Sequence, residues 1–482
     1  MRTAASRHIA ADLALSRAAG APLIDGNAVR VLRDGAENYP AWLDAIAGAE
    51  RFIHFDSYIL HDDRTGRLFA DALAARARAG VRVRVLYDWV GAVRATSRAY
   101  WYRLREAGVE VRGFNRPVAW RPLAWLSRDH RKMLAVDGRV AYVSGLCVGD
   151  DWVGTADMPP WRDTGVEILG PAVADIHAAF AEIWDTTGAP LPPDEQPACA
   201  TLPRRGSVAL RVIGSTPATA AMLRLDVLVA GLARERLWIT DAYFVGVPGY
   251  VQALTAAAAD GVDVRLLVPG ATDLPLVRSF TRAGYRGLLE GGVRVFEWNG
   301  SMVHAKSAVA DGLWGRVGST NLNLQSWMGN WELDVAIEDA GVATDLERMF
   351  ERDLEQCTEV VLDTRRRIQP VPPQAAGGGP ASPAPGAPGR GWRRRRGRRG
   401  SSGKAAAGAL RLGNTVGAAL TARRSLGTAE APTLVTGGTV LLGIAALAVW
   451  WPALLAYPAA GLALWLGLSL LGAAWRARAG RT

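Results

Sequence analysis

Cysteine and lysine are both scarce in this chain of 482 residues. None of its three cysteines belongs to a CxxC pair, and the odd number argues against a disulfide framework or a structural zinc site. These cysteines are Cys147, Cys199 and Cys357. Of the 56 basic residues only three are lysines, and the other 53 are arginines. The lysine positions are therefore informative, because arginine meets almost every other need for positive charge: they are Lys132, Lys306 and Lys404.

The first 24 residues lack an apolar run and carry a polar or charged side chain every few positions. A signal peptide needs an apolar stretch of about 7–15 residues, so none is expected here. The free cysteines are compatible with a reducing compartment, and the body of the protein is expected to face the cytosol.

Acidic residues are almost absent from the C-terminal segment. From Val371 to the end there are 14 basic residues and one acid, Glu430. Removing these from the totals of 56 basic and 46 acidic residues leaves 42 and 45 in residues 1–370, a net charge of −3. The basicity belongs to the segment after residue 370, so nucleic acid is not expected as a partner of the body.

The C-terminal segment has two parts of different composition. Residues 371–404 are rich in Pro, Gly and Arg and are expected to form a disordered linker, whose arginine tract favours an anionic lipid surface over RNA. Residues 431–475 carry no formal charge, which is enough for two spans of about 20 apolar residues. Arginines flank this run on both sides, so a C-terminal transmembrane helical hairpin with cytoplasmic ends is predicted. A buried or oligomerising helical hairpin is the alternative.

An internal repeat organises residues 1–370. RFIHFDSYIL from Arg51 parallels RLWITDAYFV from Arg236, GVRVRVLYD from Gly80 parallels GVDVRLLVPG from Gly261, and GVEVRGFN parallels GVRVFEWN, at offsets of 185, 181 and 184 residues. Each copy alternates strand-like and helix-like segments. Two fused homologous α/β domains are predicted, at 25–189 and 208–365, joined by a Pro-rich linker at 190–207.

Each copy also carries a histidine followed two residues later by a lysine and seven residues later by an aspartate. The two motifs are HRKMLAVD, with His130, Lys132 and Asp137, and HAKSAVAD, with His304, Lys306 and Asp311. With six histidines and three lysines, roughly 0.04 His-x-Lys pairs are expected by chance. A compact ammonium suits a tetrahedral phosphate oxygen, so the lysines indicate phosphate chemistry.

Strand spacing indicates which of these side chains share a face. Residues two apart point the same way, so each histidine faces the same side as its lysine. The aspartates lie about 20 Å further along an extended strand, which is too far to touch the imidazoles. Asp137 and Asp311 precede glycines and are predicted to hold hairpin turns. Asp163 and Glu332, which follow the histidines by 33 and 28 residues, are predicted to orient the imidazoles.

The repeated motif resembles that of the phospholipase D superfamily, and GSTN at Gly318–Asn321 resembles the family's G-S-x-N. WRDTGVEILGPAV and GGVRVFEW resemble bacterial cardiolipin synthases, over about residues 25–360. Two departures are Cys147 in place of the family's Asn and Gly165 in place of a common His. The resemblance implies two phospholipase D-like domains, each a mixed sheet flanked by helices, related by a pseudo-two-fold axis with the active site at their interface. It implies six catalytic motif residues: His130, Lys132, Asp137, His304, Lys306 and Asp311.

The chemistry of a phosphodiester explains this set of groups. One neutral imidazole attacks phosphorus and the other protonates the leaving alcohol, then deprotonates the acceptor. The lysines, with Ser319 and Asn321, are expected to hold the non-bridging oxygens, and no metal ion or cofactor is expected. The resemblance favours His130 as nucleophile and His304 as acid, with the reverse assignment open.

Three functions are compatible with these features. A cardiolipin synthase would move a phosphatidyl group between two phosphatidylglycerol molecules at the bacterial inner membrane, with the catalytic body in the cytoplasm. A membrane-anchored phospholipase D or phosphodiesterase would use water instead. A catalytically idle scaffold would only bind anionic lipid through its arginine tract.

Four acids, Asp150, Asp151, Asp157 and Asp163, lack metal-ligand spacing and favour a solvated loop over a cation site.

Overall fold

The computed structural model describes residues 4–117, 126–217, 219–362 and 368–371, with a few isolated positions between 439 and 468. The chain forms two compact units, residues 1–117 with 123–376, and 118–122 with 377–482. All elements named below belong to the first unit. The predicted linker at 371–404 and the predicted hairpin at 431–475 lie outside the described residues, apart from those isolated positions. Among the described residues, no helix combines the length and apolar character needed to cross a bilayer.

One mixed sheet forms the centre of the N-terminal half. Its order is β4-β3-β2-β6-β7-β8-β1, with β4, β3 and β2 parallel and the other neighbours antiparallel. Its strands are β1 (Ile24–Arg33), β2 (Phe52–Ser57), β3 (Arg82–Asp88), β4 (Glu110–Phe114), β6 (Lys132–Val136), β7 (Val140–Ser144) and β8 (Thr164–Leu169). The short β5 (Arg128–Asp129) pairs with a strand of the other half. The helices are α1 (Ala4–Ala19), α2 (Asp34–Ala47), α3 (Arg64–Arg78), α4 (Trp89–Ala92), α5 (Arg98–Glu106) and α6 (Val173–Asp185).

The C-terminal half repeats this sheet with the same order and strand directions, β12-β11-β10-β13-β14-β15-β9. Its strands are β9 (Val208–Ser215), β10 (Arg236–Asp241), β11 (Asp263–Pro269), β12 (Arg294–Trp298), β13 (Lys306–Ala310), β14 (Trp314–Gly318) and β15 (Asn330–Glu338). Two further strands, β16 (Cys357–Leu362) and β17 (Ile368–Val371), extend the β12 edge. The helices are α7 (Ala221–Leu232), α8 (Pro248–Ala259), α9 (Pro275–Glu290), α10 (Leu324–Met328) and α11 (Ala340–Leu354).

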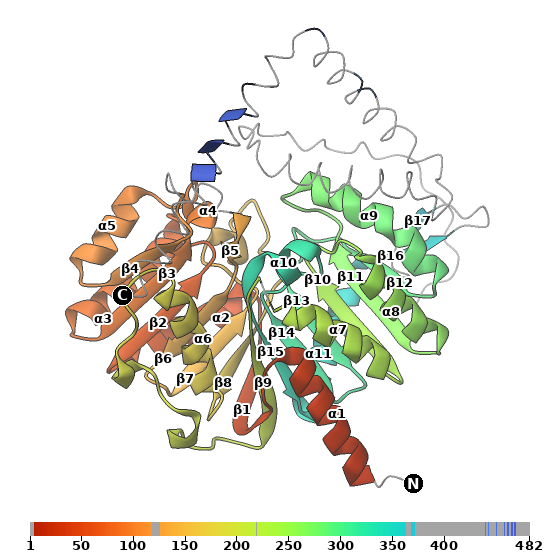
Figure 1. The fold of residues 1–482 in the computed structure, drawn as a ribbon, viewed down its shortest axis with the longest axis horizontal. Helices are drawn as coiled ribbons and strands as arrows, with labels where there is room; N and C mark the ends of the chain where they lie inside the picture. Colours follow the sequence, from red (N-terminus) through yellow and green to blue (C-terminus); the bar gives the residue numbers. More distant parts are fainter. Residues whose placement is uncertain are drawn as a thin grey trace. The chain divides into compact units, whose positions relative to one another are not determined.

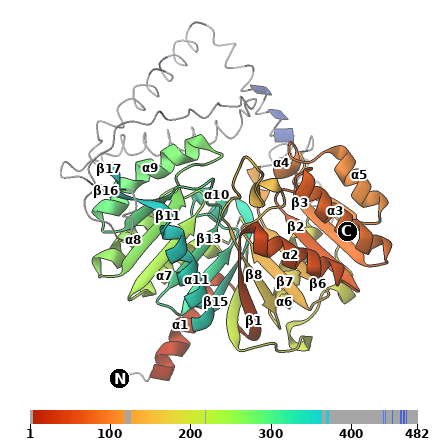
Figure 2. The ribbon, with the colours of Figure 1, turned by 180° about the vertical axis from the view of Figure 1, so that it is seen from behind.

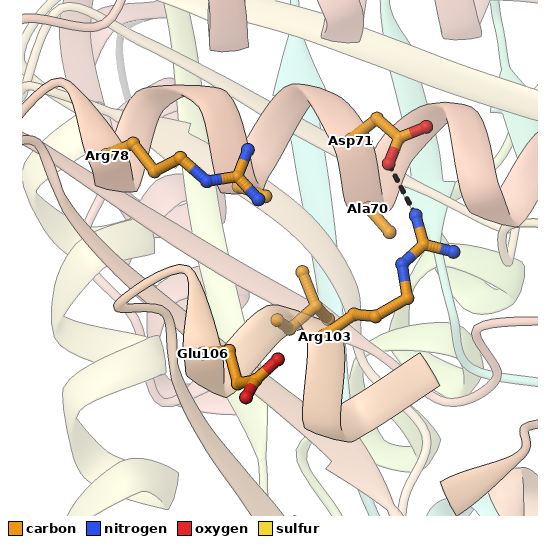
Figure 3. A pocket seen from close by; sticks show the side chains of 7 residues that line it. Ala70, Asp71, Arg78, Arg103 and Glu106 are labelled. Atoms are coloured by element: carbon orange, nitrogen blue, oxygen red, sulfur yellow. Dashed lines mark hydrogen bonds and ion pairs between the residues drawn. The ribbon is translucent and has the colours of Figure 1, made fainter. Parts of the chain in front are cut away.

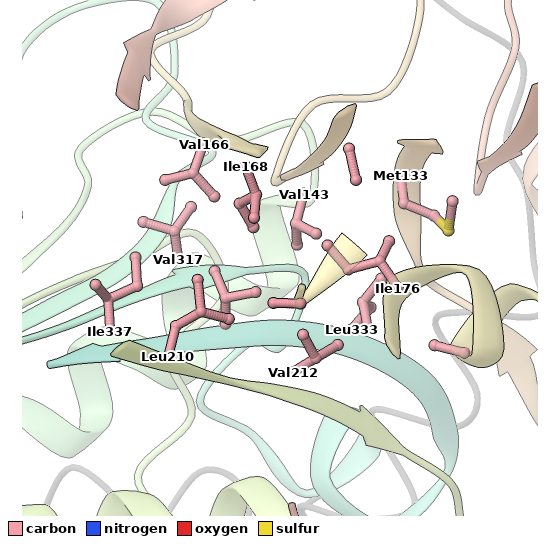
Figure 4. Close-up of a cluster of buried hydrophobic side chains, with 14 of the residues drawn as sticks. Met133, Val143, Val166, Ile168, Ile176, Leu210, Val212, Val317, Leu333 and Ile337 are labelled. Atoms are coloured by element: carbon pink, nitrogen blue, oxygen red, sulfur yellow. The ribbon is translucent and has the colours of Figure 1, made fainter. Parts of the chain in front are cut away.

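The hydrophobic core has three parts, one of which joins the halves. Helices α2, α3 and α5 cover the outer face of the first sheet, and α7, α8 and α9 cover that of the second (Figures 1 and 2). Between the sheets, Val166 and Ile168 of β8 pack with Leu210 of β9 and with Val317 and Leu333 of the second sheet (Figure 4). Each fully buried side chain of this size contributes about 1.5–3 kcal/mol relative to an exposed one, so the halves are held together by a continuous apolar layer.

The predicted α/β fold with mixed sheets flanked by helices is confirmed. Central strands are buried along their whole length because both of their faces are covered; all six residues of β2, polar ones included, are buried, for example. The first strand bridges the halves, since Ile24 and Asn27 pair with β9 whereas Ala28–Arg33 pair with β8. The predicted domain limits, 25–189 and 208–365, stay predictions.

A chain of buried polar groups lies between β2, α6 and the segment that connects the halves. The Gly138 N–H donates to His177 Nε2 at 3.2 Å, so the ring proton of His177 lies on Nδ1 and is donated to His54 Nδ1 at 2.8 Å. His54 Nε2 then donates to Glu195 at 3.2 Å, and Glu195 is paired with Arg84. This sequence of bonds requires both imidazoles to be neutral.

These histidines predict a loss of stability in mild acid. Burial lowers the pKa of His54, and burial together with His54 lowers the pKa of His177 well below its usual value. The unfolded chain therefore takes up protons first, as pH falls below about 6.5. A histidine whose folded-state pKa is lowered by one contributes about 1.4 kcal/mol to the free energy of unfolding above that pH, and this contribution is lost as pH falls. We expect the free energy of unfolding in denaturant titrations to fall from pH 7 to pH 5.

His177→Gln should flatten this pH dependence, because one of the depressed groups is removed. His61→Gln is the matched control, since His61 lies outside the chain of buried bonds. An unchanged pH slope in His177→Gln would contradict the explanation.

Candidate active site

The two His-x-Lys motifs lie where the central strands end. β6 and β13 each begin at the motif lysine. In the sheet register these lysines lie opposite the last residues of the adjacent strands, Lys132 opposite Ser57 and Lys306 opposite Asp241. The backbone of each motif is also attached to the other half. The N–H of His130 donates to Trp331 O at 2.8 Å, and the N–H of His304 donates to the carbonyl of residue 162 at 2.7 Å. The apolar layer between the sheets therefore brings the motifs together.

Each imidazole is oriented by a carboxylate from the other half. His130 Nδ1 lies 2.9 Å from Glu332 Oε2, and His304 Nδ1 lies 2.7 Å from Asp163 Oδ2. Both carboxylates are fully buried. A proton held on Nδ1 by a carboxylate leaves the lone pair on Nε2 available. The structure thus places both predicted carboxylates on imidazoles, and shows that each serves the histidine that lies in the other copy of the repeat.

The two carboxylates are held by different donors. Glu332 accepts hydrogen bonds from the Ser319 hydroxyl at 2.6 Å and the Asn330 amide at 3.2 Å. Asp163 accepts them from the Trp152 indole at 2.9 Å and from the backbone N–H of residue 164 at 2.9 Å. Gly145 occupies the position that matches Ser319. A Cβ atom there would stand 2.2 Å from Asp163 Oδ1, so the first half has no room for a serine.

The motif lysines are buried cations without a carboxylate partner. Their exposed fractions are 1% for Lys132 and 0% for Lys306, and neither forms an ion pair with any residue in the described ranges. Each ammonium donates to the carbonyl of its own histidine. It also lies over a tyrosine ring, Lys132 at 5.1 Å from Tyr58 and Lys306 at 5.7 Å from Tyr243. Two buried cations that form no ion pair favour an anionic ligand.

The surroundings of both imidazoles lower their pKa values. Burial lowers the pKa of His130 well below its usual value, with further lowering by Lys132, Lys306 and Arg128. Burial and Lys306 lower the pKa of His304 to about 4, although Asp163 opposes this. Burial also lowers the pKa of Lys306 to about 8. Because the charges of each half act on the histidine of the other, these groups form one electrostatic unit.

Two residues of the predicted site have a different role in the structure. The carboxylate of Asp137 accepts backbone N–H bonds from residues 50, 51 and 52, each at 2.8 Å. Asp311 does the same for residues 234, 235 and 236. Both have left-handed backbone angles, with φ of 56° and 51°. They fasten the hairpin turn to the start of β2 or β10, at the strand end away from the imidazoles. These bonds agree with the predicted turn role, and the catalytic assignment that the resemblance implied for both acids stays a prediction.

The predicted phosphate contact of Ser319 stays a prediction, and its hydroxyl has other partners in the structure. Its hydroxyl proton is used by Glu332, and its oxygen accepts the backbone N–H of Leu333 at 2.9 Å, so no donor is left for a phosphate oxygen. Asn321 still has hydrogen-bonding capacity for a ligand. Its amide group donates one long bond of 3.5 Å, to Ser326, and its Oδ1 is buried without a partner. Cys147 occupies the matching position in the first half. Burial raises the pKa of its thiol, while both motif lysines act to lower it.

The other departure from the family pattern, Gly165, has a steric reason. It lies in β8 opposite Ser144, and a Cβ atom at this position would stand 2.0 Å from Asn38 Oδ1. Asn38 itself is fully buried and donates to Asp34 O at 2.8 Å. The asparagine therefore fills the space that a histidine at residue 165 would need.

Sequence reasoning missed four side chains of this site: Tyr58, Arg128, Trp152 and Tyr243. The tyrosines follow the repeated aspartates of β2 and β10, so their recurrence was a usable signal. Arg128 and Trp152 were not among the residues that recur in the repeat segments, so the repeat gave no signal for them.

A surface pocket of about 450 Å³ lies elsewhere, between α3 and α5 (Figure 3). It is lined by Asp71, Arg78, Arg103 and Glu106 around the apolar side chains of Ala70, Ala74 and Leu104. The exposed Arg103 pairs with Asp71 at 2.6 Å. The pocket contains none of the motif residues, so we do not assign the chemistry to it.

Comparison with known proteins identifies the family. Residues 42–149 and 230–354 match the family model described as cardiolipin synthase, PLD-like domain. Cardiolipin synthase A of Pseudomonas syringae pv. syringae is 33% identical over 374 residues, which cover 76% of this chain and 77% of that protein. Cardiolipin synthase of Alkalihalophilus pseudofirmus is 32% identical over 348 residues, covering 70% and 68%.

A solved structure shares the fold. The crystal structure of phosphatidylserine synthase from Haemophilus influenzae Rd KW20 superposes with a TM-score of 0.58 at 16% identity, covering 74% of this chain and 93% of that one. This likeness concerns the fold alone. The sequence matches decide the family, and both of the segments that match its model carry a complete His-x-Lys motif. The chain belongs to the cardiolipin synthase family of the phospholipase D superfamily.

Proposed function

We propose that the protein is a cardiolipin synthase that transfers a phosphatidyl group from one phosphatidylglycerol to another and releases glycerol. The observation that carries the proposal is the pair of crossed histidine–carboxylate contacts with two unpaired buried lysines between them. The relatives named cardiolipin synthase support this choice of substrate and product. The active site then lies at the interface of the two halves, which a pseudo-two-fold axis relates.

The first step forms a phosphohistidine. Nε2 of one imidazole attacks phosphorus, the N–P bond forms, and the P–O bond to the glycerol headgroup breaks. The other imidazole, protonated, gives its proton to the departing glycerol oxygen. Lys132 and Lys306 stabilise the charge on the non-bridging oxygens, with the Asn321 amide as a further donor.

The second step reverses these roles. The imidazole that protonated glycerol now takes the proton from the terminal hydroxyl of a second phosphatidylglycerol. That oxygen forms a bond to phosphorus, the N–P bond breaks, and cardiolipin and the free imidazole are produced. The carboxylates of Glu332 and Asp163 stabilise the imidazolium that arises in each half-reaction.

We assign the nucleophile to His130 and the acid to His304. Asp163 contacts His304 at the shorter distance, 2.7 Å, and this contact together with the nearby charge of Lys306 lowers the pKa of Asp163 in spite of its burial. Burial raises the pKa of Glu332, so His130 has the weaker anionic support and is the more readily kept neutral. A neutral imidazole is the better nucleophile and an imidazolium is the required acid.

The catalytic body is proposed to work against the cytoplasmic face of the bacterial inner membrane. Leu324 and Met328 of α10 are 45% and 44% exposed, and α10 begins three residues after Asn321. Leu126 is 47% exposed and accepts a hydrogen bond from the Gln325 side chain at 3.1 Å, so it lies beside them. Exposed apolar side chains next to the site support contact with a lipid surface. The predicted C-terminal hairpin would supply the anchor.

The purified full chain with phosphatidylglycerol vesicles provides the test. We expect cardiolipin and glycerol to accumulate in equal amounts, as measured by lipid mass spectrometry and a glycerol assay. Phosphatidic acid with glycerol and no cardiolipin would identify a hydrolase. Vesicle binding without any product would identify an idle scaffold.

A further inference from the structure

Arg128 is a cation beside the site without a counter-charge. Its Nη1 donates to the Tyr58 hydroxyl at 3.0 Å, and its Nε is buried with no hydrogen-bond partner. Among the described residues, no carboxylate lies within ion-pair distance of its guanidinium. Residues 118–125, which precede it in the chain, contain no Asp or Glu. An arginine so placed is unusual in a chain whose buried arginines, such as Arg162 and Arg316, are paired with carboxylates.

The nearby acids do not neutralise it. The oxygens of Asp88 accept backbone N–H groups of residues 90 and 91 on one side and of residue 129 on the other. Burial raises the pKa of Asp88 to about 7 and that of Asp129 to about 6. Asp129 Oδ1 accepts the backbone N–H of residue 131, and burial together with Asp129 raises the pKa of the neighbouring Asp56 well above its usual value. Arg128 therefore keeps its positive charge available for a ligand.

Tyr58 ties Arg128 to the reacting groups. Its hydroxyl accepts a hydrogen bond from the guanidinium. The centroid of its ring lies 5.0 Å from that of the His130 ring in an edge-to-face arrangement, and 5.1 Å from Lys132 Nζ. Glu332 occupies Nδ1 of His130, and Arg128 makes its hydrogen bond with Tyr58, so the two charged side chains do not share a partner. A ligand anion at Arg128 would stand next to the transferred phosphate.

The sequence position of the second half that is equivalent to Arg128 carries no cation. The residue two positions before His304 is Met302, which is buried. Tyr243, the counterpart of Tyr58, donates its hydroxyl to Asp273 at 2.8 Å and not to an arginine. Each half contributes one lysine to the transferred phosphate, whereas Arg128 adds a positive charge from the first half.

We propose that Arg128 binds the phosphodiester of the acceptor lipid. This inference rests on the proposed function, in which two phosphatidylglycerol molecules meet at one site. The acceptor carries its own phosphate anion three carbons from the attacking hydroxyl, and the lysines already serve the phosphate under transfer. A guanidinium presents several N–H donors to such an oxyanion and would lower the repulsion between the two lipids. Water and free glycerol bring no charge and need no such residue.

Arg128→Met, which copies Met302 of the other half, separates these acceptors. Two rates are compared with the full chain in vesicles: cardiolipin formation, and exchange of labelled glycerol into phosphatidylglycerol, which uses an uncharged acceptor. Loss of a charge-assisted contact predicts that cardiolipin formation falls roughly 10-fold to 100-fold more than glycerol exchange. Arg128→Lys keeps the charge without the planar fork, so its rate of cardiolipin formation should lie between those of Arg128→Met and the natural chain.

The outcomes are distinguishable from failure of the proposed function. A natural chain that makes no cardiolipin overturns the function itself. If Arg128→Met lowers both rates equally, Arg128 only supports Tyr58 and His130 or binds the donor phosphate, and the inference is wrong. If neither rate changes, it is wrong as well. Thermal unfolding of the variant checks that the fold is retained.

Discussion

Replacing either motif histidine by alanine is expected to lower cardiolipin formation by roughly 10³-fold or more. The reason is that His130 and His304 perform different chemistry in the same cycle, so neither can substitute for the other. The other buried imidazoles are committed elsewhere, since His54 and His177 bond to each other at 2.8 Å. Initial rates of cardiolipin and glycerol release from phosphatidylglycerol vesicles measure the effect.

Trapping the phosphoenzyme then assigns the roles. The donor for this test is a phosphatidyl ester labelled at phosphorus whose leaving group needs no acid. Acid-labile label on the protein should then be absent from His130→Ala and should still form in His304→Ala. The opposite pattern would make His304 the nucleophile. His61→Ala, outside both histidine–carboxylate pairs, is the control and should retain the rate. Full activity in either motif variant would reject the mechanism.

Glu332→Gln and Asp163→Asn are expected to lower the rate by roughly 10²-fold to 10⁴-fold each. An amide at either position cannot stabilise an imidazolium, and it can donate to Nδ1 and move the ring proton to Nε2, which removes the reactive lone pair. Both carboxylates are fully buried, so solvent cannot replace them. Ser319→Ala is the graded control, because Glu332 would keep its bond from Asn330 at 3.2 Å, and a smaller loss is expected.

The crossing of the pairs gives this prediction a signature that simple destabilisation lacks. In proton NMR, the low-field Nδ1–H signal assigned to His130 should disappear in Glu332→Gln, while that of His304 remains. Asp163→Asn should show the reverse. If Glu332→Gln removed the His304 signal instead, each carboxylate would belong to the histidine of its own half, contrary to the structure.

The repeat and its motifs could be recognised from the chain alone. The strands around Asp56 and Asp241 recur at a constant offset, and local hydrophobic patterns define them without knowledge of the partner half. Strand geometry also predicted the role of Asp137 and Asp311, since seven extended residues place them too far from the imidazoles. Each of these inferences depends on short sequence separations or on direct repetition.

The partnerships within the site could not be predicted in the same way. His130 and Glu332 are 202 residues apart, and His304 and Asp163 are 141 apart. The position of Ser319 in the motif suggested a substrate contact, but its hydroxyl is taken by a carboxylate whose location depends on how the sheets pack. Arg128 was one of 53 arginines, and only its place beside Tyr58 and the site, without an ion-pair partner among the described residues, distinguishes it.

The sequence by itself therefore determined the chemistry: two histidines, two lysines among very few, and two carboxylates at matching places in a duplicated α/β unit. These follow from residue type and spacing, which are local properties of the chain. Only the tertiary structure decided which carboxylate serves which histidine, and which cation is left unpaired. Both depend on the apolar layer between the sheets, because burying Val166, Leu210 and Val317 together sets the two halves against each other and brings each motif to the other's carboxylate.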